Sequence, residues 1–180
     1  MKYIFFARHG ETTWNVQNKI CGATDAPLTE KGVAQAKKLG QRIAAGDFNI
    51  DVILTSPLIR AADTAAEVSK ITGIPMRIEE RLREQCFGKW EGTSPRNSPG
   101  FTAAKSGFLD SFGGGESMMR VGQRVYNLLD ELKDSDKTYL LVAHNGIARF
   151  VRSYFGDMSN DEFARFCIKN CEIRRFDYKE

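Results

Sequence analysis

Two histidines and two arginines stand directly after, or shortly after, apolar stretches of the chain. Arg8 and His9 follow the first such stretch, Arg60 comes soon after the second, and His144 follows another. The chain has no other histidine. An imidazole can act as a nucleophile or a proton carrier, and a guanidinium offers forked N–H donors to an anion. One histidine alone would more often be structural, but the four side chains together would suit chemistry on a phosphate group.

Arg60 gives a further indication of an anion. A helix capped by Ser56, with Pro57 in its first turn, would place Arg60 in that same turn. A cation there opposes the positive end of the helix macrodipole, and a bound anion would reverse the sign of that interaction. The alternative is an exposed arginine whose charge is screened by solvent.

Buried strands are predicted where the chain is almost continuously apolar. Amphipathic helices are predicted between them, because apolar residues recur at helical spacing on one face. The strands are expected at 2–7, 51–55 and 138–143, with a late edge strand at 171–178. The helices are expected from a cap at Thr29 to Gly46, from Ser56 to Gly73, and onward from a cap at Ser117.

This alternation predicts an α/β fold, a three-layer sandwich in which a mostly parallel sheet carries helices on both faces. Ligands of such sheets bind beyond the carboxyl ends of the strands, so the three strand ends are expected to form one site. With 180 residues, 42% of them hydrophobic, the chain is expected to fold as one domain over 1–180. The stretch 93–115 is rich in Gly, Ser and Pro and is expected to be a lid-like insertion, the alternative being a disordered surface loop.

Composition argues against several classes of protein. The net charge of +3 is spread along the chain without a run of Lys or Arg, which gives no support for binding to nucleic acid or to a membrane surface. The apolar stretch before Arg8 is too short for a signal peptide or a membrane helix, so we expect a cytoplasmic protein. The four cysteines form no CxxC pair, and no histidine lies near Cys167 and Cys171 to complete a zinc site, so no metal is expected.

Six sequence blocks, in order, resemble the histidine phosphatase superfamily, which includes phosphoglycerate mutases and many phosphatases. Together they span most of the chain. The blocks are FFARHGETTWN (5–15), GATDAPLTEKG (22–32), TSPLIRAADTA (55–65), LREQCFGKWEG (82–92), GGGES (113–117) and VAHNGIAR (142–149). One departure is Asn145, where many relatives have glycine; its backbone N–H remains available, and its side chain is expected to influence substrate choice.

The resemblance implies a role for each matching residue. His9 would be the nucleophile that forms a phosphohistidine. Glu84 would be the general acid that protonates the leaving group and later deprotonates water. The residues that bind the substrate would be Arg8, Asn15, Arg60, His144 and Asn145. No metal or cofactor is implied, because the arginines supply the positive charge that phosphoryl transfer needs.

The activity implied is that of a phosphomonoesterase acting on a small-molecule phosphate ester, similar to broad-specificity or α-ribazole phosphatases of the family. The alternative is a cofactor-dependent phosphoglycerate mutase. Glycolytic mutases of the family carry a longer insertion where this chain has only 93–112, which favours hydrolysis. A homodimer is a further option that the sequence leaves open.

Two other classes fit less well. The string Asp-Ser-Asp-Lys-Thr at 134–138 matches the DxDxT pattern of magnesium-dependent phosphatases of the haloacid dehalogenase type. That string should follow a buried strand, whereas here it follows an amphipathic helix, which favours a simple turn. A protein that binds phosphorylated partners without catalysis is disfavoured, because every expected catalytic position is filled.

Overall fold

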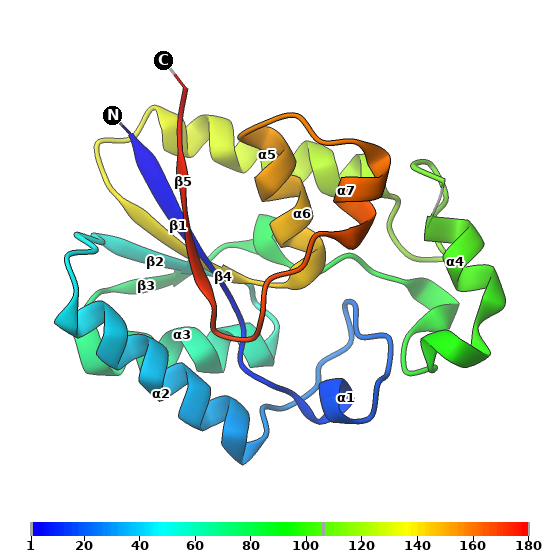
Figure 1. Cartoon of the computed structure of the whole chain (residues 1–180), viewed down its shortest axis with the longest axis horizontal. Coiled ribbons are helices and arrows are strands. Elements are labelled where there is room, and N and C mark those ends of the chain that lie inside the picture. The colour runs from blue at the N-terminus through cyan, green and yellow to red at the C-terminus, as the bar shows by residue number, and fades with distance from the viewer. Residues whose placement is uncertain (1, 106, 180) are drawn as a thin grey trace.

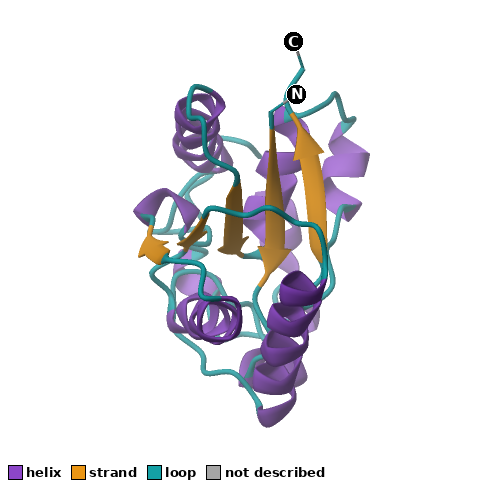
Figure 2. Cartoon of the chain, turned by 90° about the vertical axis from the view of Figure 1, so that its left-hand side faces the viewer, coloured by secondary structure: helices purple, strands orange, loops and turns teal. Residues whose placement is uncertain are grey.

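The computed structural model describes residues 2–105 and 107–179 and is built around a five-stranded sheet (Figure 2). The strand order is β3-β2-β4-β1-β5. Four strands are parallel, and the edge strand β5 runs antiparallel to β1. The strands are β1 (Tyr3–Arg8), β2 (Val52–Thr55), β3 (Met76–Ile78), β4 (Tyr139–Ala143) and β5 (Ile173–Asp177).

The four strands expected from the sequence are confirmed, including the late edge strand, and β3 is an addition. Only three residues long, β3 has a half-buried Met76 followed by the exposed Arg77 and Ile78. It therefore lacks the continuous apolar run that marks the other parallel strands.

Helices cover both faces of the sheet (Figure 1). One face carries α2 (Glu30–Ala45) and α3 (Ile59–Thr72), and the other carries α5 (Met118–Lys133) and α6 (Asn145–Tyr154). Successive side chains of β1 point to opposite faces of the sheet. Phe5 packs in the hydrophobic cluster with α2 and α3, and Phe6 packs in the cluster with α5 and α6. The predicted three-layer α/β sandwich is confirmed.

The starts of α2 and α5 lie where the sequence predicts them, because the side chains of Thr29 and Ser117 accept hydrogen bonds from the first turns. The predicted start of α3 at Ser56 is wrong. That helix begins at Ile59, whose backbone N–H donates to Asp25 Oδ1 at 2.8 Å. The cap thus comes from a segment remote in sequence, and Ser56 lies before the helix, where its Oγ accepts from the N–H of Leu58.

Several short helices are not evident in the sequence. Helix α6 begins directly after His144, because Ile147, Ala148, Phe150 and Val151 give it a buried stripe. The other short elements are α1 (Thr13–Val16), α4 (Pro99–Lys105), α7 (Asn160–Arg165) and 3-10 turns at Glu80–Leu82, Gly88–Trp90 and Pro95–Asn97. Among the described residues, no helix is both long enough and apolar enough to cross a membrane.

The segment 93–115, apart from residue 106, which lies outside the described residues, packs against the core. Phe101 and Phe112 are 6% and 0% exposed and meet the ring of Phe87 edge to face. The alternative of a disordered loop is therefore wrong for the described part. Phe108, by contrast, is 44% exposed and faces a cavity considered below.

Candidate active site

The two histidines follow neighbouring strands at the same level of the sheet. Arg8 of β1 pairs with Ala143 of β4, so His9 and His144 come next on adjacent strands. The backbone N–H of His9 donates to the carbonyl of Ala143 at 2.9 Å, and the two imidazole rings are 5.2 Å apart between centroids. Ser56 leaves β2 on the other side of β4 at the same edge. The convergence predicted for the three strand ends is confirmed.

His9 has one ring nitrogen held and one free. Its Nδ1 lies 2.7 Å from the carbonyl oxygen of Gly10, and because a carbonyl oxygen can only accept, Nδ1 carries the proton. Nε2, which then bears the lone pair, has no hydrogen-bond partner among residues 2–105 and 107–179. A Cβ on Gly10 would lie 2.5 Å from the carbonyl oxygen of Gly32, so this turn requires glycine. The carbonyl of Gly10 thus fixes the tautomer of the ring.

Both imidazoles are kept neutral by their surroundings. Burial lowers the pKa of His9 well below its ordinary value of 6.5, and the cations Arg60 and Arg8 lower it further. Burial also lowers the pKa of His144, again with Arg60 acting in the same direction. A neutral His9 can attack phosphorus at neutral pH.

The neutral imidazoles of His9 and His144 should make the folded state less stable in mild acid. The unfolded chain takes up a proton on each histidine as the pH falls below about 6.5, while the folded chain does not. The unfolded state then binds more protons, so the free energy of unfolding falls with falling pH. Between pH 7.5 and 5.5 the loss should be about 3 kcal/mol for two such groups, measurable by urea unfolding.

A His9→Asn variant is the control for this prediction. It should retain the fold and lose about half of the pH dependence, because only His144 still resists protonation. Carboxyl groups add little in this window, since their ordinary pKa values lie near 4. A free energy of unfolding that is unchanged between pH 7.5 and 5.5 would contradict the neutral imidazoles.

The two arginines near the histidines, Arg60 buried and Arg8 half-buried, have no carboxylate partner. Arg60 is 1% exposed, and its Nη1 and Nη2 donate to the carbonyls of Thr24 and Gly22 at 3.0 and 2.7 Å. Arg8 Nη1 donates to the carbonyl of Ile168 at 2.9 Å. Within the described residues, no carboxylate lies within 4.0 Å of either guanidinium. Arg60 is thus not a solvent-screened surface residue, and a bound anion would compensate both charges.

His144 is fully buried and is oriented by Ser56. Its Nε2 lies 2.7 Å from Ser56 Oγ, which also accepts a hydrogen bond from the backbone N–H of Leu58 at 3.3 Å. We therefore assign the serine hydroxyl as donor to Nε2, which leaves the ring proton on Nδ1. This Nδ1 is buried and has no partner in the described part of the chain.

The same shortage of partners recurs at Arg8 Nε. Arg8 Nε and His144 Nδ1 are the buried side-chain polar atoms that the described residues leave without a hydrogen bond. Buried groups without partners are rare in folded proteins and call for an explanation. Both belong to this one site, and an oxyanion placed there would accept from both.

Three asparagines surround these groups. Asn15 Oδ1 accepts from the backbone N–H of Thr12 in a capping box, so its Nδ2 is the group that remains for a phosphate. Asn145 Oδ1 accepts from the backbone N–H of Ile168 at 2.9 Å, and the side chain thereby holds the loop that binds Arg8. Asn170, which no sequence motif indicated, donates from Nδ2 to the carbonyl of His9 at 2.8 Å.

Glu84 lies against the first turn of α6. It is 6% exposed, and its two oxygens accept from the backbone N–H groups of Gln85 at 3.0 Å and Gly146 at 2.9 Å. A Cβ on Gly146 would come within 2.3 Å of Glu84 Oε1, so glycine is required for this approach. The carboxyl group of Glu84 is therefore held at the start of the helix that follows His144.

Two other expectations concern metals. The DxDxT string at 134–138 joins α5 to the amino end of β4, whereas the histidines stand at the carboxyl ends of the strands. Within residues 2–105 and 107–179, no group of three His, Cys, Asp or Glu side chains is arranged to hold a metal ion.

Known proteins match the whole of this architecture. A relative named probable phosphoglycerate mutase GpmB, from Salmonella choleraesuis, is 34% identical over 100% of this chain and 86% of its own length. The α-ribazole phosphatase of Shigella flexneri superposes with a TM-score of 0.84 at 26% identity, covering 99% of this chain and 91% of the other. A mycobacterial glucosyl-3-phosphoglycerate phosphatase solved with VO3 gives a TM-score of 0.85 at 26% identity over 97% and 90%.

The family profile described as histidine phosphatase superfamily (branch 1) matches residues 4–180. The matched range contains both histidines, both arginines and Glu84. This match, together with the relative at 34% identity, establishes the family. The chain belongs to the histidine phosphatase superfamily.

Proposed function

We propose that this protein is a phosphomonoesterase that works through a phosphohistidine on His9 and needs no metal ion. The observation that carries the proposal is the pair of buried, unpartnered donors at Arg8 and His144 beside a neutral imidazole with a free Nε2. Two similar structures are named phosphatases, and one of them was solved with VO3. Cationic and N–H donors of this kind stabilise the charge that develops on a transferring phosphoryl group.

In the first step, the phosphate of the ester binds to Arg8, Arg60, His144 and Asn15. His9 Nε2 then attacks phosphorus, and the bond from phosphorus to the alcohol oxygen breaks. Glu84 gives its proton to that oxygen as the alcohol leaves. The phosphoryl group stays on Nε2, while Nδ1 keeps its proton against the carbonyl of Gly10.

In the second step, Glu84 takes a proton from water as the water oxygen attacks phosphorus. The bond between phosphorus and Nε2 breaks, inorganic phosphate leaves, and Glu84 is again protonated. One carboxyl group thus serves as acid and then as base. The guanidiniums of Arg8 and Arg60 supply the positive charge in both steps.

A phosphoglycerate mutase is the second candidate, because the relative at 34% identity carries that name. Both activities share the first step and differ in what accepts the phosphoryl group. A hydrolase passes it to water, and a mutase passes it to another hydroxyl of the sugar acid. The same residues would serve both reactions, so only the products distinguish a hydrolase from a mutase.

The decisive measurement is a set of phosphate esters, including 4-nitrophenyl phosphate and phosphoglycerates, incubated with and without a chelator. We expect free phosphate to be released at the same rate in both conditions, with no isomerised phosphoglycerate. Isomerised product without free phosphate would support the mutase instead. Loss of activity with the chelator would contradict the metal-independent mechanism.

A further inference from the structure

A cavity of about 580 Å³ opens between α4, the start of α5 and the helices α6 and α7. Its volume is in the range typical of ligand pockets, about 300–1,000 Å³. The lining used below consists of Phe101, Lys105, Phe108, Met118, Arg149 and Phe163. It is mainly apolar and includes two cations.

Lys105 and Arg149, which line the cavity, both lie within range of the charge of Glu84. Gly146, which donates to Glu84, and Arg149 are three residues apart on α6 and therefore share a face of that helix. Arg149 is thus one turn beyond the contact with Glu84, on the side away from His144. The group that leaves with the proton of Glu84 would depart in this direction.

Lys105 and Arg149 are brought together here without an ion pair to any carboxylate of the described residues. Burial lowers the pKa of Lys105, and Arg149 lowers it further, with Glu84 opposing both. Arg149 Nε donates to the carbonyl of Phe166 at 3.1 Å. Neither cation has a carboxylate within 4.0 Å in the described residues, and Glu84 already accepts two backbone hydrogen bonds.

The carboxylate of Asp161, which also lines this cavity, does not cancel the positive charge of Lys105 and Arg149. Asp161 is 83% exposed at its side chain and lies 3.6 Å from Arg165 on its own helix. Its charge is therefore screened by water and shared with an arginine outside the cavity lining. The part of the cavity lined by Lys105 and Arg149 therefore remains positive.

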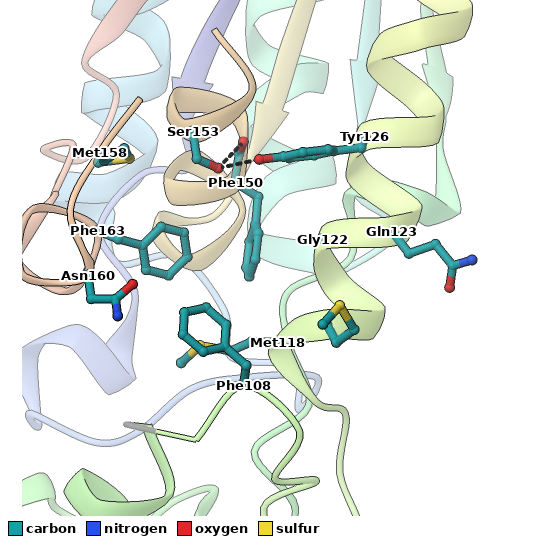
Figure 3. A pocket seen from close by; sticks show the side chains of 11 residues that line it. Phe108, Met118, Gly122, Gln123, Tyr126, Phe150, Ser153, Met158, Asn160 and Phe163 are labelled. Carbon is teal, nitrogen blue, oxygen red and sulfur yellow. Dashed lines mark hydrogen bonds between the residues drawn. The ribbon is translucent and has the colours of Figure 1, made fainter. Parts of the chain in front are cut away.

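The outer part of the cavity is apolar and continues into a second one. The second cavity, of about 660 Å³, shares four lining residues with the first, namely Phe108, Met118, Asn160 and Phe163. Figure 3 shows the side chains of Phe108, Met118, Phe150 and Phe163 close together on its wall. Such a surface can hold an aromatic or aliphatic group much larger than a three-carbon acid.

We propose that the alcohol portion of the substrate is a bulky apolar group that carries a second negative charge. The charge is bound between Lys105 and Arg149, and the apolar body occupies the adjoining cavity. This inference rests on the proposed phosphatase function and specifies the substrate class of that site.

The test uses two esters that differ in charge but are close in size: 6-carboxy-2-naphthyl phosphate and the methyl ester of its carboxyl group. For the wild-type protein, kcat/KM should be at least about 10-fold higher for the free acid, as expected for a hydrogen-bonded charge. In Lys105→Met, which retains an apolar stem, this ratio should fall toward 1. Lys105→Arg should restore most of the preference, and exposed Lys70→Met should leave both rates unchanged.

The outcomes distinguish a failure of this inference from a failure of the proposed phosphatase function. Equal hydrolysis of both esters by the wild-type protein, or a ratio that survives in Lys105→Met, overturns the substrate class and leaves the phosphatase intact. A preference for the methyl ester overturns it as well. If the protein releases phosphate from neither ester nor from 4-nitrophenyl phosphate, the proposed function fails and the inference fails with it.

Discussion

Replacement of His9 by alanine should abolish turnover, with kcat at least about 10⁴-fold below the wild-type value. It should also remove every trace of phosphoenzyme. The reason is that Nε2 of this ring is the free lone pair of the site, while the protonated Nδ1 is held by Gly10. Rapid quenching with a ³²P-labelled ester, followed by mass spectrometry, would measure the label directly.

The second histidine provides the comparison. His144→Ala removes one donor to the phosphate but leaves the nucleophile, so the rate should fall by about 10²–10³-fold while a phosphorylated peptide containing His9 is still found. His9→Asn replaces the imidazole by a smaller polar side chain and should preserve the fold without activity. Its unfolding curve shows whether the fold is preserved. A label on His144, or full labelling of His9→Asn, would contradict the assignment of the nucleophile.

The placement of the histidines and of Arg60 could be predicted from the sequence for a physical reason. Parallel strands that are buried on both faces appear as apolar runs, and the residues that follow them must gather at one edge of the sheet. The chain's histidines follow two such runs, which pair in register as β1 and β4. Choosing Glu84 over its neighbours, however, depended on the family resemblance and not on any pattern of spacing.

The contacts that tune the site could not be predicted, because they join segments that are distant in the chain. Asp25 caps α3 from a distant loop, and Ser56, which lies before that helix, hydrogen-bonds to His144. Asn170 binds the backbone of His9 from a loop without any motif. Lys105 at the end of α4 and Arg149 of α6 line one cavity although they lie far apart in the chain. Local sequence carries no signal for such pairs.

In the proposed mechanism, the start of α6 links phosphate binding to proton transfer. His144 is the N-cap residue of this helix, and Gly146, in its first turn, donates to Glu84. In the proposed mechanism, the phosphate donor His144 and the general acid Glu84 are therefore both held at the start of one helix, His144 as its N-cap and Glu84 through the hydrogen bond from Gly146. Such pre-organisation reduces the reorganisation required as the ester bond breaks.

Glu84→Gln should therefore slow the enzyme most for esters with poor leaving groups. Glutamine keeps the size and can still accept from Gly146, but it has no acidic proton to give. For an alkyl phosphate, kcat/KM should fall by about 10²–10⁴-fold, the usual contribution of a general acid. For 4-nitrophenyl phosphate the fall should be much smaller, because the phenolate leaves without protonation. The parameter to compare is kcat/KM, which reports the step that forms the phosphohistidine.

Hydrolysis of the phosphohistidine, the second step, predicts another measurable effect of Glu84→Gln. Water activation also requires the carboxylate, so Glu84→Gln should accumulate phosphoenzyme with 4-nitrophenyl phosphate and release nitrophenol in a burst. Glu80→Gln is the matched control, because Glu80 lies four residues earlier, is 69% exposed at its side chain and pairs with Arg83. It should leave both esters within about 2-fold of wild type, as for an exposed ion pair. Equal losses of kcat/KM for alkyl and aryl esters in Glu84→Gln would show that Glu84 positions the phosphate and does not protonate the leaving group.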